Sequence, residues 1–371
     1  MSLVLTFVKQ RNIKVLVNVA MISQVRGDTQ IRTVVDLIED EFTRQRGLDA
    51  RPDLRVTIDL ASQPVQLEVY GPVLAEHLGG VFNHLVIDAA TPRRALFIEL
   101  ATLHEATIEF REKLSVPPPG IVVAEPLGPL MVELHAGLSV ATDRAAARVT
   151  ALAGAIGDLP SSHLSHPFAH VFGWLGAQRQ AYITHGAAIG RDGRGLLFAG
   201  SGGQGKSTTA LACAAAGWEF AGDDFMMLDR TAAGTYAAHS LYATGRLHPA
   251  QAARFPSLVA NWDSLLSPED NKLTLFPRAG AVSLVRRMTI EGIVLPIVGP
   301  DQGEITPLPR AAALRALMAD SVRIYPWLTR ERMQFYAEAV ETLPCYKLTV
   351  GPDIAAIPAA VGRALDRALQ R

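Results

Sequence analysis

Apolar and polar positions alternate in short runs along the first part of the chain, the pattern of half-buried strands. The runs that favour strands are LRVTIDLA, VQLEVY, LVIDAA, RALFIELA and ATIEFRE, and the longer TVVDLIEDEFTRQR has the periodicity of a helix. This mixture predicts an α+β domain.

After residue 180 the pattern becomes an ordered series of elements around a glycine-rich turn. AYITHGAAI and LLFA favour strands joined by the turn GRDGRG, and KSTTALACAAAG favours a helix that ends at Gly217. WEFAG and FMMLD favour two more strands on either side of a pair of aspartates. Later strands are expected at LTLFP, AVSLVRR, EGIVLPIV and YKLTV, and helices at RAAALRALMAD, at RERMQFYAEAVETL and after Pro352. Strands and helices in this order predict an α/β domain.

The segment SSHLSHPFAH, residues 161–170, separates the two patterns because its polar residues and proline interrupt both periodicities. We place the boundary there, which predicts an N-terminal α+β domain over residues 1–165 and an α/β domain over residues 166–371. A chain of 371 residues with 49% apolar content is long enough for two cores. The spacing of His163, His166 and His170 is compatible with a metal site, but Pro167 interrupts any shared helix, so a polar interdomain loop is the favoured interpretation.

The composition of the chain argues against several classes of protein. The chain has 35 basic and 36 acidic residues, so its net charge gives no reason to expect binding to bulk nucleic acid or to an anionic membrane. Cys213 and Cys345 are the only cysteines, which excludes a disulfide framework and suits a reducing cytoplasm. No apolar run reaches the roughly eighteen residues of a membrane-spanning helix. We therefore expect a soluble, cytoplasmic protein with neither a nucleic-acid nor a membrane partner.

Residues 200–207, GSGGQGKS, fit the phosphate-loop pattern G-x-x-x-x-G-K-[ST] between a predicted strand and a predicted helix. The glycines of such a loop let backbone N–H groups point inward and hold phosphate oxygens at a helix N-terminus. Lys206 would reach the β and γ phosphates, and Ser207 would supply a hydroxyl to Mg²⁺. The alternative is a flexible glycine turn on the surface. The residues expected to bind nucleotide are Gly200, Ser201, Gly202, Gly203, Gln204, Gly205, Lys206, Ser207 and Thr208.

Asp223 and Asp224 follow the apolar run WEFAG, so we expect them at the carboxyl end of that strand, where open α/β sheets bind ligands. There they would face the phosphate loop. One would hold Mg²⁺, directly or through water, and the other would accept the proton of an attacking hydroxyl. Two alternatives stay open: that a single aspartate is functional while the other caps a turn, or that both are surface acids.

The second domain resembles the catalytic domain of HPr kinase/phosphorylase, a bacterial P-loop protein serine kinase, and of its wider family. His185 and Gly186 match a His-Gly pair that precedes the loop in that family, and GRDGRGLLFAGSGGQGKS matches its strand, turn, strand and loop. Gly217 matches the glycine after the helix, and Asp223 with Asp224 matches the family's paired aspartates. The resemblance extends over residues 180–300 and, more loosely, to LPCYKLTV.

This resemblance implies an HPr-kinase/PEP-carboxykinase-like fold and a Mg²⁺-dependent transfer of the γ-phosphoryl group of ATP to a serine hydroxyl. It implies Asp223 and Ser207 at the metal and Lys206 at the phosphates, with His185 close by, and it favours Asp224 as the base. Two departures weaken the case for a second metal contact and for the reverse phosphorolysis: no acid occurs between Asp229 and Asp263, and Thr208 stands where bifunctional members carry glutamate.

The sequence gives less direct evidence about the acceptor of the phosphoryl group and about where it binds. Members of this wider family with an unrelated N-terminal half occur in lasso-peptide clusters, where they phosphorylate a C-terminal serine of the precursor. The resemblance therefore implies a peptide or protein serine as acceptor, and residues 1–165 are the candidate for binding it. A kinase for a small alcohol and a nucleotide-binding regulatory module without transfer stay open as alternatives. Also open are the donor (ATP, GTP or pyrophosphate), a homo-oligomeric state, and whether Arg246, Lys272 and Arg278 stabilise phosphoryl charge or form surface ion pairs.

Overall fold

The computed structural model describes residues 28–46, 51–88, 96–102, 121–124, 130–135, 137–267, 271–278, 280–300, 303–324 and 330–370. It is a mixed α/β protein that divides into two compact units. The first unit comprises the described parts of Met1–Asp53, Glu68–Gly71 and Leu96–Pro160, and the second comprises those of Leu54–Leu67, Pro72–Ala95 and Ser161–Arg371. No helix within the described ranges is both long and apolar enough to cross a membrane.

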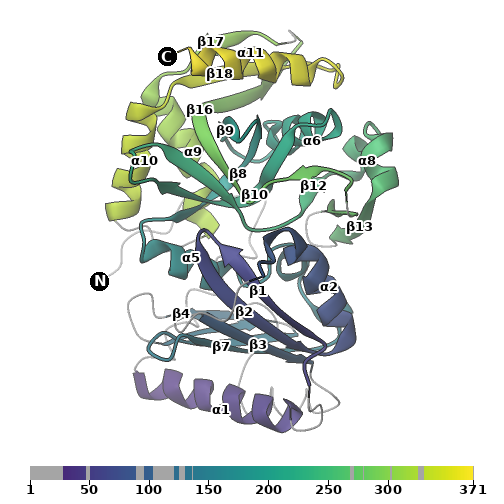
Figure 1. The fold of residues 1–371 in the computed structure, drawn as a ribbon, viewed down its shortest axis with the longest axis vertical. Coiled ribbons are helices and arrows are strands. Elements are labelled where there is room, and N and C mark those ends of the chain that lie inside the picture. The colour runs from purple at the N-terminus through teal and green to yellow at the C-terminus, as the bar shows by residue number, and fades with distance from the viewer. Residues whose placement is uncertain are drawn as a thin grey trace, which may run out of the picture. The chain divides into compact units, whose positions relative to one another are not determined.

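The first unit packs one helix against a sheet. Its elements are α1 (Asp28–Arg46), β3 (Leu96–Thr102), β4 (Ile121–Ala124), β5 (Leu130–His135), β6 (Leu138–Asp143), β7 (Arg148–Ala153) and the short 3-10 turn η3 (Ile156–Asp158). The strands follow the order β3-β7-β6-β5-β4, in which only β3 and β7 are parallel. The apolar side of α1, with Val35, Ile38 and Phe42, lies along the sheet and forms the core there (Figure 1). The predicted helix and the strand RALFIELA are confirmed as α1 and β3, whereas ATIEFRE lies outside the described residues.

Two more strands, β1 (Leu54–Leu60) and β2 (Gln63–Tyr70), precede α2 (Pro72–Phe82) and the 3-10 turn η2 (Asn83–Leu85). They complete a seven-stranded sheet of order β1-β2-β3-β7-β6-β5-β4 and confirm two predicted strands. The strand predicted at LVIDAA is wrong for its described part: Leu85 ends the turn η2, and Val86 makes a single isolated bridge to Ile58. Leu85 is buried at the end of this turn, whereas Val86 and Ile87 are only partly buried.

Residues 54–67 and 72–95 group with the second unit, although the sequence pattern placed them in the N-terminal domain. Hydrogen bonds to backbone carbonyls between Val81 and Val86, from the end of α2 to the residue after η2, explain part of this grouping. Arg286 donates hydrogen bonds to the carbonyls of His84 and Val86, at 2.9 and 2.5 Å, and the N–H of Ala243 donates to the carbonyl of Val81 at 3.1 Å. Contacts between residues so distant in sequence leave no trace in periodicity.

The environment of His84 predicts that the folded protein loses stability in mild acid. Its Nε2 lies 2.6 Å from Ser240 Oγ, and burial, together with the charge of Arg286, lowers its pKa from the ordinary 6.5 to about 4. The unfolded chain therefore takes up a proton near pH 6.5, whereas the folded chain does so only near pH 4. The free energy of unfolding should be highest above that window and fall through it, by about 3 kcal/mol for this group.

Urea unfolding of wild type and of His84→Gln, measured at several pH values through the window, isolates this contribution because all other groups are shared. The wild-type curve should fall more steeply with acidity than that of the variant. Parallel curves would show that His84 titrates alike in both states.

The second unit is built on an eight-stranded mixed sheet of order β11-β10-β8-β9-β16-β18-β17, with β15 paired to β10 and a further pairing of β11 with β16. Strand β9 is parallel to β16, and β16 to β18, whereas β8 is antiparallel to both β9 and β10. The strands are β8 (Tyr182–Arg191), β9 (Arg194–Phe198), β10 (Glu219–Arg230), β11 (Tyr236–Ser240), β15 (Ser283–Leu284), β16 (Arg287–Val298), β17 (Ile305–Pro307) and β18 (Cys345–Val350).

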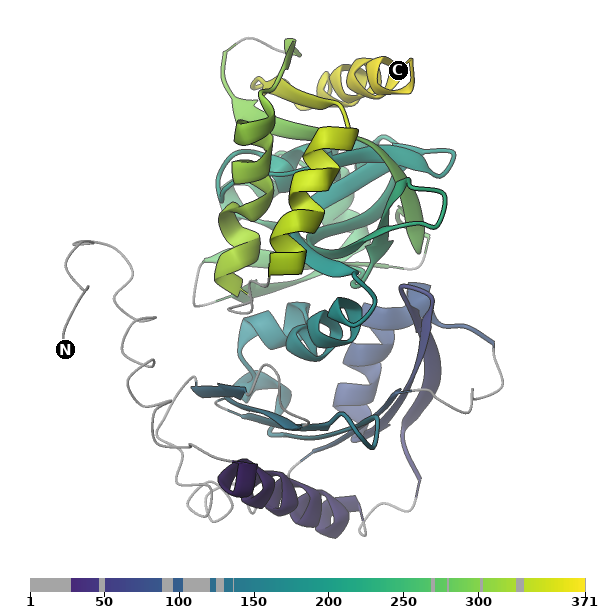
Figure 2. The same cartoon turned by 90° about the vertical axis from the view of Figure 1, so that its left-hand side faces the viewer.

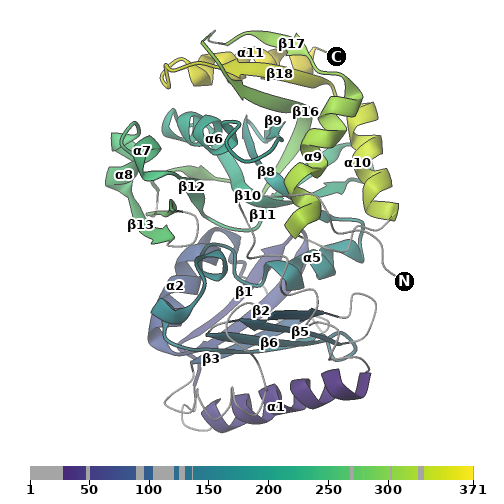
Figure 3. The same ribbon diagram turned by 180° about the vertical axis from the view of Figure 1, so that it is seen from behind.

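Helices cover both faces of this sheet (Figures 1 and 3). On one face, α6 (Lys206–Ala215) and α11 (Ile357–Leu369) pack around Trp218 and Phe198. On the other, α9 (Arg310–Ile324) and α10 (Arg330–Thr342) lie side by side (Figure 2). They pack around Tyr336 and Met288. All four helices were predicted, and α6 ends shortly before Gly217, whose φ of 82° is the left-handed conformation expected of a glycine after a helix.

The remaining elements border the site. A three-stranded sheet of order β12-β14-β13 stands beside two short helices. The elements are β12 (Gly245–Leu247), α7 (Pro249–Ala252), α8 (Pro256–Asn261), β13 (Trp262–Ser267) and β14 (Lys272–Pro277). The segment interpreted as a polar loop is largely helical instead, since α4 (Ser161–Ser165) and α5 (Ala169–Ala177) occupy it. That interpretation is wrong because the segment packs into the interior, and its His166 is buried.

Candidate active site

The glycine-rich loop runs from the end of β9 to Lys206, the first residue of α6, as the sequence predicted. Gly200, Gly203 and Gly205 have positive φ values of 145, 84 and 98°, which other residues rarely adopt. The side chain of Gln204 folds back onto the loop, where its Oε1 accepts a hydrogen bond of 2.6 Å from the N–H of Ser201. The loop therefore has the backbone freedom and the place in the fold that a phosphate cradle requires.

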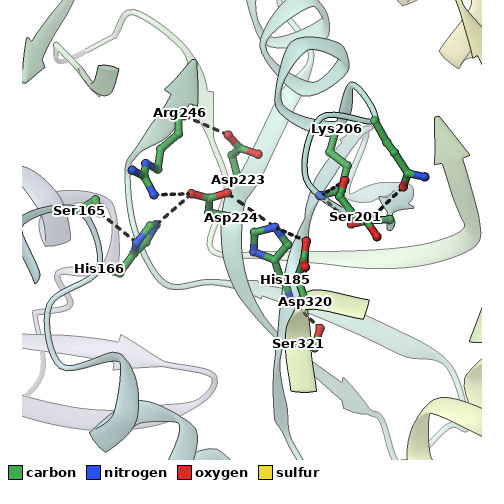
Figure 4. A network of polar contacts seen from close by, with 12 residues as sticks. Ser165, His166, His185, Ser201, Lys206, Asp223, Asp224, Arg246, Asp320 and Ser321 are labelled. Carbon is green, nitrogen blue, oxygen red and sulfur yellow. Dashed lines mark hydrogen bonds and ion pairs between the residues drawn. The ribbon is translucent and has the colours of Figure 1, made fainter. Parts of the chain in front are cut away.

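Lys206 lies within this loop and only 6% of it is exposed. Its Nζ donates hydrogen bonds to the carbonyls of Gly200, at 2.6 Å, and Ser201, at 3.1 Å (Figure 4). Burial lowers the pKa of this ammonium, whereas the nearby carboxylates of Asp223 and Asp224 act in the opposite direction. A positive charge is thus held at the loop and within electrostatic reach of both aspartates.

The aspartate pair lies within one continuous strand, β10, and not between the end of one strand and the start of another. The expectation of a carboxyl-end site is therefore wrong. An irregularity between Phe220 and Gly222 shifts the register against β8, and Asp224 has a φ of 66°. These two distortions break the alternation of side chains within the strand, and the sequence shows this only as a polar pair between two apolar runs.

Asp223 is 1% exposed and contacts the start of α6 and β12. Its Oδ2 accepts a hydrogen bond of 3.0 Å from the backbone N–H of Arg246, and its carboxylate is also hydrogen-bonded to the side chain of Ser207. Its Oδ1 is buried and has no hydrogen-bond partner among the described residues. Burial, and then the negative charge of Asp224, raise the pKa of Asp223 to about 7. The two predicted metal ligands, Ser207 and Asp223, are thus adjacent.

Asp224 has different partners. Its Oδ2 lies 3.5 Å from Nη1 of Arg246 and 3.9 Å from Nε2 of His166, and its Oδ1 lies 4.0 Å from Nε2 of His185 (Figure 4). Burial favours the neutral acid, but His185, His166 and Arg246 outweigh it and lower the pKa of Asp224 to about 2. Because burial lowers the pKa of His166 to about 3 and also lowers that of His185, the lasting positive charges that act on this carboxylate include those of Arg246 and Lys272. The environments of the two aspartates therefore separate their proton affinities.

His185 is held by α9. Its backbone N–H donates a hydrogen bond of 2.9 Å to Ser321 Oγ, and its Nε2 lies 3.7 Å from Asp320 Oδ2. The imidazole thus stands between two carboxylates, Asp320 and Asp224. Sequence reasoning identified His185 but missed Asp320, because an acid near the end of an amphipathic helix is normally a solvated surface residue.

A pocket of about 200 Å³ brings Asp224 and His185 together with the loop, whereas Asp223 and Asp320 do not line it. Its lining includes Asp224, His185, Arg246 and Lys272, together with loop and helix residues Gly202, Gly203, Gly205, Lys206, Ser207 and Thr208. Gly200, Ser201 and Gln204 shape the loop rather than line the pocket. Arg278 lies elsewhere, in an exposed ion pair with Asp263 at 2.8 Å. In the described part of the chain, no group of three or more His, Cys, Asp or Glu side chains is arranged to hold a metal ion.

The family described as SynChlorMet cassette protein ScmC matches residues 168–255 of this chain. The matched span contains β8, the loop, α6, the aspartate pair and Arg246, and it excludes His166 and Asp320. No curated protein matches the chain.

Proposed function

We propose that this protein is an ATP- and Mg²⁺-dependent kinase that transfers the γ-phosphoryl group to a serine hydroxyl of a peptide or protein. The observation that carries the proposal is the meeting, in one pocket, of a glycine-rich loop, its buried lysine and the buried carboxylate of Asp224. A phosphate cradle next to two acids of separated proton affinity suits phosphoryl transfer to an alcohol. The proposal includes an HPr-kinase-like fold for the second unit, supported by the order of its motifs.

The donor nucleotide would bind through its phosphates at the loop. Backbone N–H groups of the loop and the N-terminus of α6 suit phosphate oxygens, and Lys206 would exchange its two carbonyl partners for them. Arg246 and Lys272 add positive charge to the same pocket. These three cationic side chains suit a triphosphate, whose negative charge is stabilised by nearby cations.

Mg²⁺ fits the side of the site formed by Ser207 and Asp223. Magnesium keeps several waters and takes only one or two protein ligands beside phosphate oxygens, so a three-residue cluster is not required. The buried, unpartnered Oδ1 of Asp223 supplies an oxygen whose desolvation a cation would offset. Once bound there, Mg²⁺ would neutralise charge on the phosphates.

Asp224 is the residue that we assign to the acceptor. The acceptor oxygen bonds to the γ-phosphorus, the bond from that phosphorus to its bridging oxygen breaks, and the electron pair leaves with ADP. The hydroxyl proton passes to Asp224, whose pKa of about 2 keeps it ionised at neutral pH. Because phosphoryl transfer depends mainly on positioning and charge, a weak base in the right place is sufficient. His185, next to Asp224 Oδ1, would orient the hydroxyl.

A transfer assay tests this function. Wild-type protein with γ-³²P-labelled ATP and Mg²⁺ is offered serine-containing peptides, each with a matched Ser→Ala peptide, and products are identified by mass spectrometry. Label should appear on the serine peptides alone. Nucleotide binding without any transfer would favour a regulatory module, and transfer confined to small alcohols would contradict the peptide acceptor.

A further inference from the structure

His166 lies between Ser165 and Asp224, outside the motifs that point to the site. Only 3% of it is exposed. Its Nδ1 is 3.0 Å from Ser165 Oγ, and its Nε2 faces Asp224 Oδ2 at 3.9 Å (Figure 4). That Nε2 has no hydrogen-bond partner among the described residues. One nitrogen is thus satisfied, and the other is a buried polar atom aimed at the carboxylate.

Aromatic packing fixes the ring in this orientation. His166 lies edge-to-face against Phe225, with ring centroids 4.5 Å apart, and against Tyr242, at 5.1 Å. The hydroxyl of Tyr242 donates a hydrogen bond of 3.0 Å to the carbonyl of Pro167. The next residue, Phe168, has a φ of 59°, a left-handed conformation that a bulky residue adopts only where its surroundings enforce it. The backbone that carries His166 is therefore tightly determined.

We infer that His166 is a positioning residue for Asp224, an inference that rests on the proposed function. In this structure the hydroxyl of Ser165 also lies within hydrogen-bond distance of the carbonyl of Ser161, at 2.9 Å, and donates to it. In the proposed arrangement the hydroxyl turns from that carbonyl to Nδ1, so that the proton of the ring is on Nε2 and points to Oδ2 of Asp224. Nη1 of Arg246 approaches the same oxygen at 3.5 Å. The two groups hold Oδ2 and leave Oδ1, on the side of His185, for the acceptor hydroxyl.

The separation of 3.9 Å exceeds a hydrogen bond, which agrees with a site that tightens when substrates bind. A neutral imidazole suits this role because it donates one hydrogen bond without adding charge next to Arg246. His166 does not line the pocket, so its effect on transfer would act through Asp224.

Steady-state kinetics of matched variants test the inference. In His166→Leu, which removes the donor, kcat should fall by about 10²-fold because the carboxylate is no longer held, while the KM for ATP stays unchanged. In His166→Gln, whose amide N–H reaches a similar position, most of kcat should return. The control is His77→Leu, which removes an imidazole whose Nε2 is 2.9 Å from the carbonyl of Leu164, away from Asp224. Its kcat should equal that of wild type. An equal fall in both leucine variants, or a wild-type kcat in His166→Leu, would overturn the inference.

A second measurement does not depend on activity. Long-range ¹H–¹⁵N spectra of the full chain labelled with ¹⁵N-histidine, assigned with His166→Gln, report which ring nitrogen carries the proton. Protonation of His166 at Nε2 is expected, and protonation at Nδ1 would overturn the inference even if every leucine variant fails to fold. Absence of transfer by wild type would instead refute the proposed function, and the spectrum would still decide whether His166 directs its N–H at Asp224.

Discussion

Replacing Asp224 with Asn is expected to lower kcat for phosphoryl transfer by about 10²- to 10⁴-fold, the usual contribution of a general base. Asn has the same shape and tolerates the φ of 66° at this position, so the variant should fold and keep its nucleotide affinity. Its amide cannot accept the hydroxyl proton. Peptide phosphorylation measures transfer, and titration with a fluorescent nucleotide measures ATP binding. A loss of transfer with unchanged ATP binding would show that Asp224 acts in the transfer step and not in nucleotide binding.

Asp223→Asn is expected to differ, because the hydrogen bonds of Asp223 within the described residues go to Ser207 and to the backbone N–H of Arg246. Loss of this carboxylate should weaken Mg²⁺ dependence and nucleotide affinity together. Asp192→Asn, at another aspartate of positive φ in the exposed turn after β8, is the matched control and should behave as wild type. If the two site variants have the same profile, or if both still transfer phosphate at the wild-type rate, the division of roles is refuted.

Lys206→Met is expected to have the second large effect. The rate of phosphoryl transfer should fall by about 10²- to 10³-fold, because one preorganised cationic donor is lost. Methionine keeps the length and the apolar stem of the side chain but lacks the ammonium that contacts Gly200 and Ser201. Ser201 is exposed, so water can replace the lysine at its carbonyl. Gly200 is buried, and the loss of this one hydrogen bond should lower the melting temperature while the fold persists. ATP affinity, kcat and the melting temperature are the quantities to compare.

Lys347→Met, on β18 and outside the lining of the pocket, is the control for removing a lysine as such. It should leave ATP affinity and kcat at wild-type values. A well-folded Lys206→Met protein with normal turnover would refute the phosphate cradle.

The local sequence pattern was sufficient to predict the glycine-rich loop, whose residues are adjacent in sequence. The glycines, Lys206 and Ser207 lie within eight consecutive residues, and strand and helix periodicities on either side placed the loop correctly. These features depend on backbone conformations that glycine and apolar periodicity encode directly. His185 was identified differently, from its match to the His-Gly pair of the family that the domain resembles.

The remaining groups come together only through tertiary structure. His166 precedes α5 and Asp320 lies on α9, and each contacts the site from a segment whose own pattern favours a loop or a solvated helix. The single strand β10 was predicted as two because polar residues normally interrupt a buried strand, yet here they are retained for their contacts with Arg246, His185 and Ser207. Periodicity does not encode such pairings between distant segments.

The left-handed backbone at Asp224 also bears on how the site can change in evolution. Aspartate, asparagine and glycine reach this conformation at low cost, whereas β-branched and bulky residues are strained in it. Asp223 has no such restriction, so the side chains that fit there are limited by space and charge alone. The two positions are therefore expected to vary differently among homologues. A homologue that has lost the activity but keeps this backbone should carry aspartate, asparagine or glycine at position 224, and this choice can be recognised in its sequence.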